Sequence, residues 1–439
     1  MTIRSTTLLF VAGLACSGCG RSVAVEEIQV SGAPSVLAAY EPGADDWPGW
    51  RGPMRNGETA SPPPPSSWSE TENVVWKVPV PGRGHASPVV VGDLIFLSTA
   101  EESEERQLVV AYDRATGEEL WRTTLHEGGF PAARDVHQKA TDANGTVVCD
   151  GERVYIAHLN SDSIIASAVD LEGEIVWQKE LGAFSSKFGY APSPALHGPY
   201  VIFAADNWGG GYLAAVGRET GDIAWRKKRS MSSTYSSPVV ARVAGSDQLL
   251  ISGDDQIVSY DPATGEENWS CRGTSEATCG TMVWSDNLVF ASGGHPGRQT
   301  LAVRADGSGE VLWSNRTKIY EPSLLVVGNE LYGTSDKGII YCWDCLTGEE
   351  RWKQRVGGSF SASPILCDDR IYAQKASGEM LVFRATAEKY DEVASNRLGE
   401  ETLASPALCG GRLYLRVASW EGDNRQEHLY CLGSGVQSE

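Results

Sequence analysis

The stretch that decides the fold of this chain runs Ala111-Tyr112-Asp113-Arg114-Ala115-Thr116-Gly117-Glu118-Glu119-Leu120-Trp121. The carboxylate of Asp113 can accept hydrogen bonds from the amides of a turn, and Gly117 supplies the positive φ that a short hairpin loop needs. Trp121 then falls on the following strand, with its indole on one face. Because one sheet cannot bury a ring of that size, the stretch predicts a second sheet stacked against the first.

The same turn recurs along the chain, and its glycine always stands four residues before a tryptophan. The copies end at Trp121, Trp177, Trp225, Trp269, Trp313 and Trp352, so the intervals are 56, 48, 44, 44 and 39 residues. A period near forty residues that contains only strands is typical of the blades of a propeller. We therefore expect these side chains, together with Trp76, to dock each blade on its neighbour.

A second repeat, most often Ser-Pro, begins the inner strand of each blade. Its eight copies start at Ser87, Gly145, Ser193, Ser237, Gly280, Pro322, Ser363 and Ser405. The seventh copy has lost the glycine turn and has a polar segment over 385–396 in its place, and the eighth stops near Leu432 without an outer strand. Residues 73–79 can supply that strand by pairing beside 429–432, which leaves no open edge.

A length of 439 residues would ordinarily suggest two or three domains, but repeats that close into one ring need only one. The predicted fold class is all-β: an eight-bladed β-propeller of four-stranded antiparallel blades over residues 73–433, closed by the N-terminal strand. A seven-bladed ring with one irregular insertion is the alternative.

The first residues are typical of a targeting segment. A positive charge at Arg4 precedes the apolar run 8–15, which is too short to span a bilayer, and Cys16 and Cys19 follow. Residues 1–19 resemble a bacterial lipoprotein signal peptide with lipidation at Cys19; lipidation at Cys16 and a plain secretory signal are the alternatives. We expect residues 20–46 to form a flexible tether and residues 47–72 an extended lead-in rich in Trp and Pro.

The net charge of the chain is −20, from 57 Asp and Glu residues against 37 Lys and Arg. Such a surface repels phosphate backbones, so we expect no nucleic-acid partner. No later stretch approaches the ~20 apolar residues that a membrane helix needs. We therefore expect contact with a membrane through the lipid anchor alone.

Residues 73–433 resemble the pyrroloquinoline-quinone-like (PQQ-like) propeller repeat, whose mark is Ala-x-Asp-x-x-Thr-Gly-x-x-x-Trp; residues 111–121 match every marked position. The lead-in over 47–53, Trp-Pro-Gly-Trp-Arg-Gly-Pro, resembles that of envelope proteins of planctomycete-type bacteria. Eight such blades behind a lipoprotein signal resemble BamB, the scaffold subunit of the outer-membrane protein assembly machinery. The resemblance implies a non-catalytic scaffold at the periplasmic face of the outer membrane, a monomer within a larger assembly, that binds envelope proteins or peptides.

The same superfamily includes quinone dehydrogenases, which place a disulfide between adjacent cysteines over their cofactor and bind calcium. This sequence has no adjacent cysteines, so we expect no cofactor, neither PQQ nor calcium, and no catalytic residue. Cys342 and Cys345 have Cys-x-x-Cys spacing without a second pair at the distance of a zinc site, so no metal is expected. Cys271 and Cys279 flank a short loop and are spaced either to form a disulfide or to stay free.

Aromatic residues recur in the loops that enter the inner strands. They are His85, Tyr190, Tyr235, Tyr320 and Phe360, and His137 lies in a further loop between blades. Because propellers bind ligands through loops on a rigid ring, these six are candidate ligand-binding residues of the funnel face, suited to a peptide, a glycan or an extended chain. Plain blade packing is the alternative interpretation.

Two further functions stay open: a quinone- or sugar-linked oxidoreductase with its site in the funnel, and a sensor of small ligands or glycans.

Overall fold

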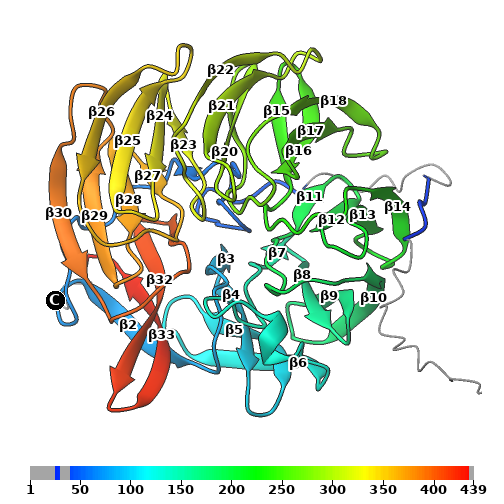
Figure 1. Cartoon of the computed structure of the whole chain (residues 1–439). Helices are drawn as coiled ribbons and strands as arrows, with labels where there is room; N and C mark the ends of the chain where they lie inside the picture. Colours follow the sequence, from blue (N-terminus) through cyan, green and yellow to red (C-terminus); the bar gives the residue numbers. More distant parts are fainter. Residues whose placement is uncertain (1–24, 30–39, 435–439) are drawn as a thin grey trace, which may run out of the picture.

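The computed structural model describes residues 25–29 and 40–434 of the chain. Eight sheets follow one another around a central axis and form a closed ring (Figure 1). The predicted signal peptide and the predicted lipidation at Cys19 lie outside the described residues. In the described part of the chain, no helix is long and apolar enough to cross a membrane.

Each blade is a meander of antiparallel strands numbered from the axis outward. Blades 1 to 4 consist of β3 (Val89–Val91), β4 (Leu94–Glu101), β5 (Arg106–Asp113), β6 (Glu119–Glu127); β7 (Val148–Cys149), β8 (Arg153–Asn160), β9 (Ser163–Asp170), β10 (Ile175–Ala183); β11 (Ala195–His197), β12 (Tyr200–Ala205), β13 (Tyr212–Gly217), β14 (Ile223–Lys228); and β15 (Val239–Val243), β16 (Ser246–Gly253), β17 (Gln256–Tyr260), β18 (Glu267–Arg272).

Blades 5 to 8 continue the ring. They consist of β19 (Val283–Ser285), β20 (Leu288–Gly293), β21 (Gln299–Arg304), β22 (Val311–Asn315); β23 (Leu325–Val327), β24 (Glu330–Thr334), β25 (Ile339–Asp344), β26 (Glu350–Arg355); β27 (Ile365–Cys367), β28 (Arg370–Gln374), β29 (Glu379–Arg384), β30 (Glu392–Arg397); and β31 (Ala407–Cys409), β32 (Arg412–Glu421), β33 (Asn424–Leu432), β2 (Val74–Val80). A short strand, β1 (Glu58–Thr59), pairs in parallel with β27, and a single 3-10 turn, η1 (Ala133–Asp135), lies between β6 and β7.

The ring is closed by the strand that the sequence predicted. Strand β2 pairs antiparallel with β33, with Val74 opposite Leu432 and Val80 opposite Glu427. The prediction of eight blades closed by the N-terminal strand is therefore confirmed, and the seven-bladed alternative is wrong. Blade 7 keeps its outer strand β30 although its glycine turn is lost, and its extra parallel strand β1 was not predicted.

The repeat turn owes its shape to one carboxylate. Asp113 Oδ1 accepts hydrogen bonds from the amides of Ala115 and Thr116 at 2.9 and 2.8 Å and from the Thr116 hydroxyl at 2.8 Å. These donors, with the Thr116 hydroxyl first, hold the pKa of Asp113 below its ordinary value. The Gly117 amide then donates to the Asp113 carbonyl oxygen at 2.8 Å, and the chain turns back into β6.

The repeat tryptophans join consecutive blades. Each indole of this kind lies against the turn of the next blade. The Trp76 indole of blade 8 lies against the blade 1 turn, where a Cβ added to Gly117 would stand 2.7 Å from the ring. Its Nε1 donates to the Arg114 carbonyl oxygen of the same turn at 3.2 Å. The indoles of Trp121, Trp177, Trp225, Trp313 and Trp352 donate in the same way to Leu171, Arg218, Pro262, Cys345 and Thr386 of the next blade.

Trp269 reaches the next blade through a relay. Its Nε1 donates to Gln248 Oε1 within blade 4 at 2.8 Å, and Gln248 Nε2 donates to the Ala305 carbonyl oxygen of blade 5 at 2.8 Å. Each of the seven indoles therefore lies at the contact between two neighbouring blades.

The axis is lined by a belt of hydroxyl groups, which we call the hydroxyl belt. The backbone amide at the start of one inner strand donates to the hydroxyl oxygen at the same place in the next blade, at 2.8–3.0 Å. The donor and acceptor pairs are Ser87–Thr146, Thr146–Ser193, Ser193–Ser237, Thr281–Ser323, Ser323–Ser363, Ser363–Ser405 and Ser405–Ser87. The belt explains why the Ser-Pro repeat carries a hydroxyl residue in every blade.

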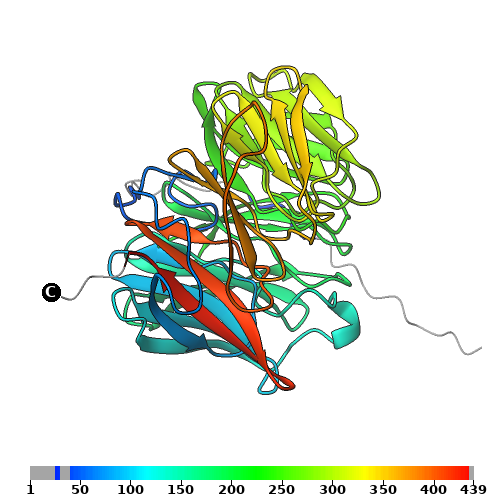
Figure 2. The same ribbon diagram turned by 90° about the vertical axis from the view of Figure 1, so that its left-hand side faces the viewer.

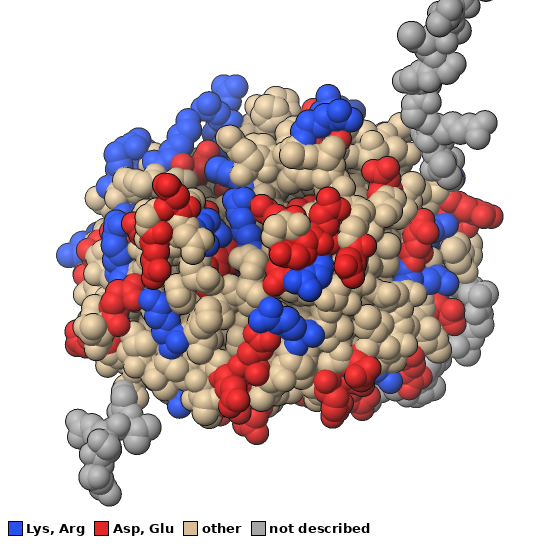
Figure 3. Space-filling view, turned by 90° about the horizontal axis from the view of Figure 1, so that it is seen from below, with Lys and Arg blue, Asp and Glu red and all other residues tan. Residues whose placement is uncertain are grey.

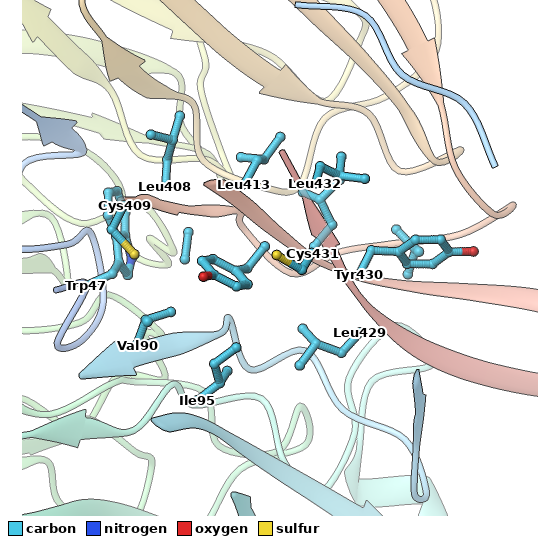
Figure 4. Packing of buried hydrophobic residues seen from close by; sticks show 14 of the residues in the cluster. Trp47, Val90, Ile95, Leu408, Cys409, Leu413, Leu429, Tyr430, Cys431 and Leu432 are labelled. Carbon is cyan, nitrogen blue, oxygen red and sulfur yellow. The ribbon is translucent and has the colours of Figure 1, made fainter. Parts of the chain in front are cut away.

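The seam between the last and the first blade is packed with apolar side chains (Figure 4). Tyr430 and Leu429 of β33 and Leu413 of β32 lie in one buried cluster with Val90 and Ile95 of blade 1. Trp47 of the lead-in belongs to the same cluster and is 1% exposed. The lead-in therefore helps to fill the core where the ring closes.

Ion pairs cover the outer side of blade 1. Arg122 Nε lies 2.7 Å from Glu119 Oε1, and Arg106 Nη2 lies 2.6 Å from Glu101 Oε2. Figure 3 shows Lys and Arg side chains among Asp and Glu over this side of the ring. Exposed pairs of this kind contribute about 0–1 kcal/mol each, so the fold depends on the seams between blades and not on its surface charges.

The seam gives a matched pair of substitutions. Gly117 and Gly92 both have positive φ, +77° and +56°, but a Cβ at Gly92 meets nothing within 4 Å. We expect Gly92→Ala to cost about 1–2 kcal/mol of unfolding free energy from backbone strain alone. Gly117→Ala should cost about 2–5 kcal/mol because the methyl group also displaces the Trp76 indole. Urea unfolding followed by fluorescence measures both, and equal losses would show that the indole does not lean on the turn.

Candidate functional site

A cavity of about 650 Å³ opens at one end of the central axis. Its walls are the loops that lead into the blades, and Thr146, Ser193 and Ser237 of the hydroxyl belt line its depth. Figure 2 shows helix η1 on this face of the ring and the lead-in on the opposite face. The cavity is therefore a funnel whose mouth lies on the side of the loops.

The lead-in forms the floor of the funnel. Trp50 lines the cavity, and its Nε1 donates to Thr281 Oγ1 at 2.8 Å. The hydroxyl belt has a gap here. Among the described residues, the Ser237 amide makes no hydrogen bond to the Thr281 hydroxyl. The Trp50 indole therefore donates to the hydroxyl oxygen that receives no backbone amide from the neighbouring blade.

Arg51 fixes this floor to the ring. Its Nη1 donates to the Pro364 carbonyl oxygen at 2.8 Å, and its Nη2 donates to the Leu324 and Asn56 carbonyl oxygens at 2.7 and 2.6 Å. The guanidinium is buried, and loss of hydration lowers the pKa of Arg51 to about 9. Strand β1 follows directly and pairs with β27, so the segment is held by side-chain and backbone bonds together.

One wall of the funnel is aromatic. The Phe188 ring lies edge-on to Trp208 and to Tyr235, with centroids 6.1 and 6.2 Å apart, and 6.0 Å from His137. Phe188 is 41% and Trp208 37% exposed. Large apolar side chains that stay exposed side by side in a concave site are typical of ligand contact. The loops before blades 2, 3 and 4 and the β12–β13 loop supply these four side chains.

The neighbouring wall carries carboxylates. Glu276 and Glu321, from the loops before blades 5 and 6, line the cavity together with Tyr320 and His295. Lys318 Nζ lies 4.6 Å from the centre of the Tyr320 ring, a cation–π contact. Burial raises the pKa of Tyr320 above its ordinary value, so its phenol stays protonated at neutral pH.

The loop between blades 1 and 2 passes over the mouth. His85 Nε2 is 2.6 Å from the Lys139 carbonyl oxygen, and the His85 amide donates to the Ala143 carbonyl oxygen at 3.0 Å. Burial lowers the pKa of His85 to about 4, so the ring is neutral at pH 7 and acts as the donor to that carbonyl. Lys139 Nζ reaches Glu321 Oε1 at 2.9 Å.

The structure brings together four of the six predicted funnel residues. His85, His137, Tyr235 and Tyr320 line the cavity. The prediction is wrong in placing Tyr190 and Phe360 there, because both are buried in the ring. Tyr190 turns inward, where its hydroxyl donates to the Ala204 carbonyl oxygen at 3.0 Å, and Phe360 lies in the core between blades 6 and 7. Binding of a ligand by the four others stays a prediction.

Sequence reasoning missed Phe188, Trp208 and Trp50. It considered the residue directly before each inner strand, whereas Phe188 stands two residues earlier in the same loop as Tyr190. Trp208 sits in a hairpin within blade 3, and Trp50 arrives from the lead-in. Phe188 could have been predicted, because it is an aromatic residue in the same loop as Tyr190. Trp208 and Trp50 could not, because their places in the funnel depend on the tertiary structure.

The eight cysteines among the described residues are free thiols. Cys271 and Cys279, for which a disulfide was left open, are both free. Cys342 and Cys345 are buried, and burial raises the pKa of each to about 12, so both are protonated at neutral pH. Within residues 25–29 and 40–434, no three or more His, Cys, Asp or Glu side chains are grouped so as to hold a metal ion.

A family model described as outer membrane protein assembly factor BamB matches residues 105–354 and 297–419. The chain belongs to this family. BamB of Burkholderia pseudomallei is 24% identical over 289 residues, and BamB of Shewanella oneidensis is 24% identical over 323 residues, which cover 62% and 72% of this chain. The matches span 66% and 64% of those two relatives, just under two thirds of their length.

Solved structures share the fold at lower identity. BamB from Moraxella catarrhalis has a TM-score of 0.59 at 16% identity and covers 81% of this chain and 99% of its own. A europium-containing methanol dehydrogenase has a TM-score of 0.70 at 11% identity and covers 90% and 99%. Since BamB and a dehydrogenase share these blades, the likeness shows the fold alone. The comparisons do not support the expected likeness to planctomycete-type proteins.

A histidine pair on β8 and β6, with the His158 ring buried and the His126 ring half-buried, gives a pH prediction. His158 Nε2 lies 3.0 Å from Ser98 Oγ, and the His126 ring lies edge-on at 5.9 Å. Burial lowers the pKa of His158 to about 3 and that of His126 to about 4. Unfolded imidazoles bind a proton near pH 6.5, so the unfolded state binds more protons between pH 6.5 and 4, and stability is lost as the pH falls through that window.

His126→Gln should therefore reduce the slope of unfolding free energy against pH between 6.5 and 4. Urea unfolding at several pH values measures that slope. His137→Gln, which removes an exposed histidine on the rim, is the matched control for the substitution itself. An unchanged slope in His126→Gln would mean that the pair is already protonated in the folded state.

Proposed function

We propose that this protein is a non-catalytic scaffold of the cell envelope that holds peptide segments of partner proteins in its funnel, with a role in outer-membrane protein assembly. The observation that carries the proposal is the aromatic wall of an open cavity whose other end is filled by the chain's own lead-in. Exposed Phe188 and Trp208 offer apolar contact, and the hydroxyl belt below offers hydrogen bonds. Membership of the BamB family supports the role in assembly.

The lead-in supports an extended peptide as the ligand. It folds through turns between Gly49 and Gly57, and on either side of them it pairs with inner strands, in parallel at β27 and by a bridge between Trp47 and Val90. Inner strands of the blades therefore turn a backbone edge to the axis at which an added segment can pair, and added strands use such edges for recognition. A peptide entering from the mouth would meet the same kind of edge above the floor.

The aromatic wall can be tested by substitution. We expect Phe188→Ala and Trp208→Ala each to weaken binding of envelope partners by about five- to 150-fold, since exposed aromatic anchors of this type contribute about 1–3 kcal/mol. Trp420→Ala is the matched control, because Trp420 is an exposed tryptophan, 48% accessible, on the β32–β33 hairpin away from the funnel. Quantitative pull-down from detergent-solubilised envelopes, compared across the variants, gives the measurement.

The outcome separates the functional classes. Partners retained equally by Trp208→Ala and Trp420→Ala would contradict binding through the funnel. Titration with the quinone and calcium tests the oxidoreductase alternative, in which a change in the quinone spectrum would replace the scaffold by an enzyme. Binding of oligosaccharides that depends on Trp208, without binding of peptides, would favour the glycan sensor.

We also propose attachment to the outer membrane through a lipid on Cys19. Labelling of cells with a radioactive fatty acid should mark the unmodified chain and Cys16→Ser, whereas Cys19→Ser should lose the label because its side chain has no thiol to acylate. Retention of the label in Cys19→Ser and its loss in Cys16→Ser would move the modification to Cys16. Absence of label in all three would leave a plain secretory signal.

A further inference from the structure

The loop before blade 2 is the longest connection between blades. It runs over residues 128–147, between the end of β6 and the start of β7, and carries η1. Its extra length accounts for the 56-residue interval between the first two repeat tryptophans. The extra residues are held over the mouth of the funnel by the bonds between His85 and the backbone of Lys139 and Ala143.

Lys139 spans the mouth to the opposite wall. The loops before blades 2 and 6 are four blades apart, which places them on opposite sides of an eight-bladed ring. Even so, Lys139 Nζ lies 2.9 Å from Glu321 Oε1. The lysine side chain is 49% exposed and the glutamate side chain 22%, so the ammonium approaches a half-buried carboxylate from the solvent side.

The wall around Glu321 accepts cations. Two carboxylates, Glu276 and Glu321, and one lysine, Lys139, line the cavity. In the part of the chain that the structure describes, no ion pair involves Glu276. Lys318 packs on the Tyr320 ring next to this wall. Two lysines of the chain itself therefore bind here, Lys139 at the Glu321 carboxylate and Lys318 at the face of the Tyr320 ring.

The pair between Lys139 and Glu321 is suited to exchange. A partly exposed ion pair contributes little to stability because water screens it, so another cation can replace Lys139 at small cost. The aromatic wall of Phe188, Trp208 and Tyr235 lies next to the carboxylates and offers apolar contact to the residues on either side of such a cation. The net charge of −20 would also favour the approach of basic segments.

We propose, resting on the peptide-binding function above, that the funnel selects peptide segments in which a Lys or Arg stands among aromatic or apolar residues. The basic side chain binds at Glu321 and Glu276, and the apolar residues bind along the aromatic wall. In the free protein Lys139 occupies the place of that basic side chain and acts as an internal competitor. Binding therefore exchanges the Lys139 ammonium at Glu321 for the basic group of the peptide, while the bonds from His85 keep the loop in place.

The experiment uses two acetylated and amidated peptides, Trp-Ser-Lys-Ser-Trp and the same sequence with norleucine in place of lysine. Isothermal titration at low ionic strength measures their affinities for the full chain. We expect the lysine peptide to bind about tenfold more tightly than the norleucine peptide. Glu321→Gln should abolish that preference. Lys139→Met should raise the affinity for the lysine peptide about three- to tenfold and leave the affinity for the norleucine peptide unchanged.

Glu310→Gln is the matched control, because Glu310 forms an exposed ion pair with Arg304 in blade 5 and does not line the funnel. It should leave both affinities unchanged, and equal melting temperatures of all variants show that each is folded. Two peptides that bind equally well, with no effect of Glu321→Gln, would overturn this inference and leave peptide binding intact. Weaker binding of the lysine peptide by Lys139→Met would overturn the role of Lys139 as competitor. Failure of both peptides to bind any variant would overturn the peptide-binding function itself.

Discussion

The whole ring depends on an indole pressed against the backbone turn of the next sheet. At the repeat turns the contact needs a residue without a side chain, because a Cβ at Gly117 would stand 2.7 Å from the Trp76 ring. The same contact recurs at Gly173 on Trp121, Gly221 on Trp177 and Gly348 on Trp313. Blades 1 to 6 thus each provide a large ring on one side and a glycine turn on the other, and Trp76 of blade 8 closes the series on blade 1.

The fold could be predicted because this contact leaves a local trace in the sequence. The four-residue offset fixes which face the indole takes, and the missing outer strand of the last copy could be matched to 73–79 because that segment carries its own tryptophan. Blade 7 shows the limit of this reasoning. Its outer strand β30 forms without the glycine turn, since backbone pairing with β29 suffices. No pattern in the sequence around residues 58–59 predicts the parallel strand beside β27.

The site was less predictable because it is assembled from loops whose direction depends on their neighbours. Tyr190 was expected in the funnel, but its hydroxyl finds the Ala204 carbonyl oxygen inside the ring. Two positions earlier, Phe188 takes the exposed place. The length of the 128–147 connection was visible as a long interval, yet its contact with Glu321, 182 residues away in the chain, could not be read from either segment alone.

The closing strand also dictates the order in which the molecule can be completed. Tyr430 Oη donates to Glu70 Oε2 across 360 residues of chain, so the first-made and last-made segments meet at one seam. Residues up to 432 must therefore be synthesised before the final sheet can form. Until then Trp47 and its neighbours have no core to enter, and contacts this distant in sequence make folding slow. Until the ring closes, the unpaired strand edges are exposed and prone to aggregation.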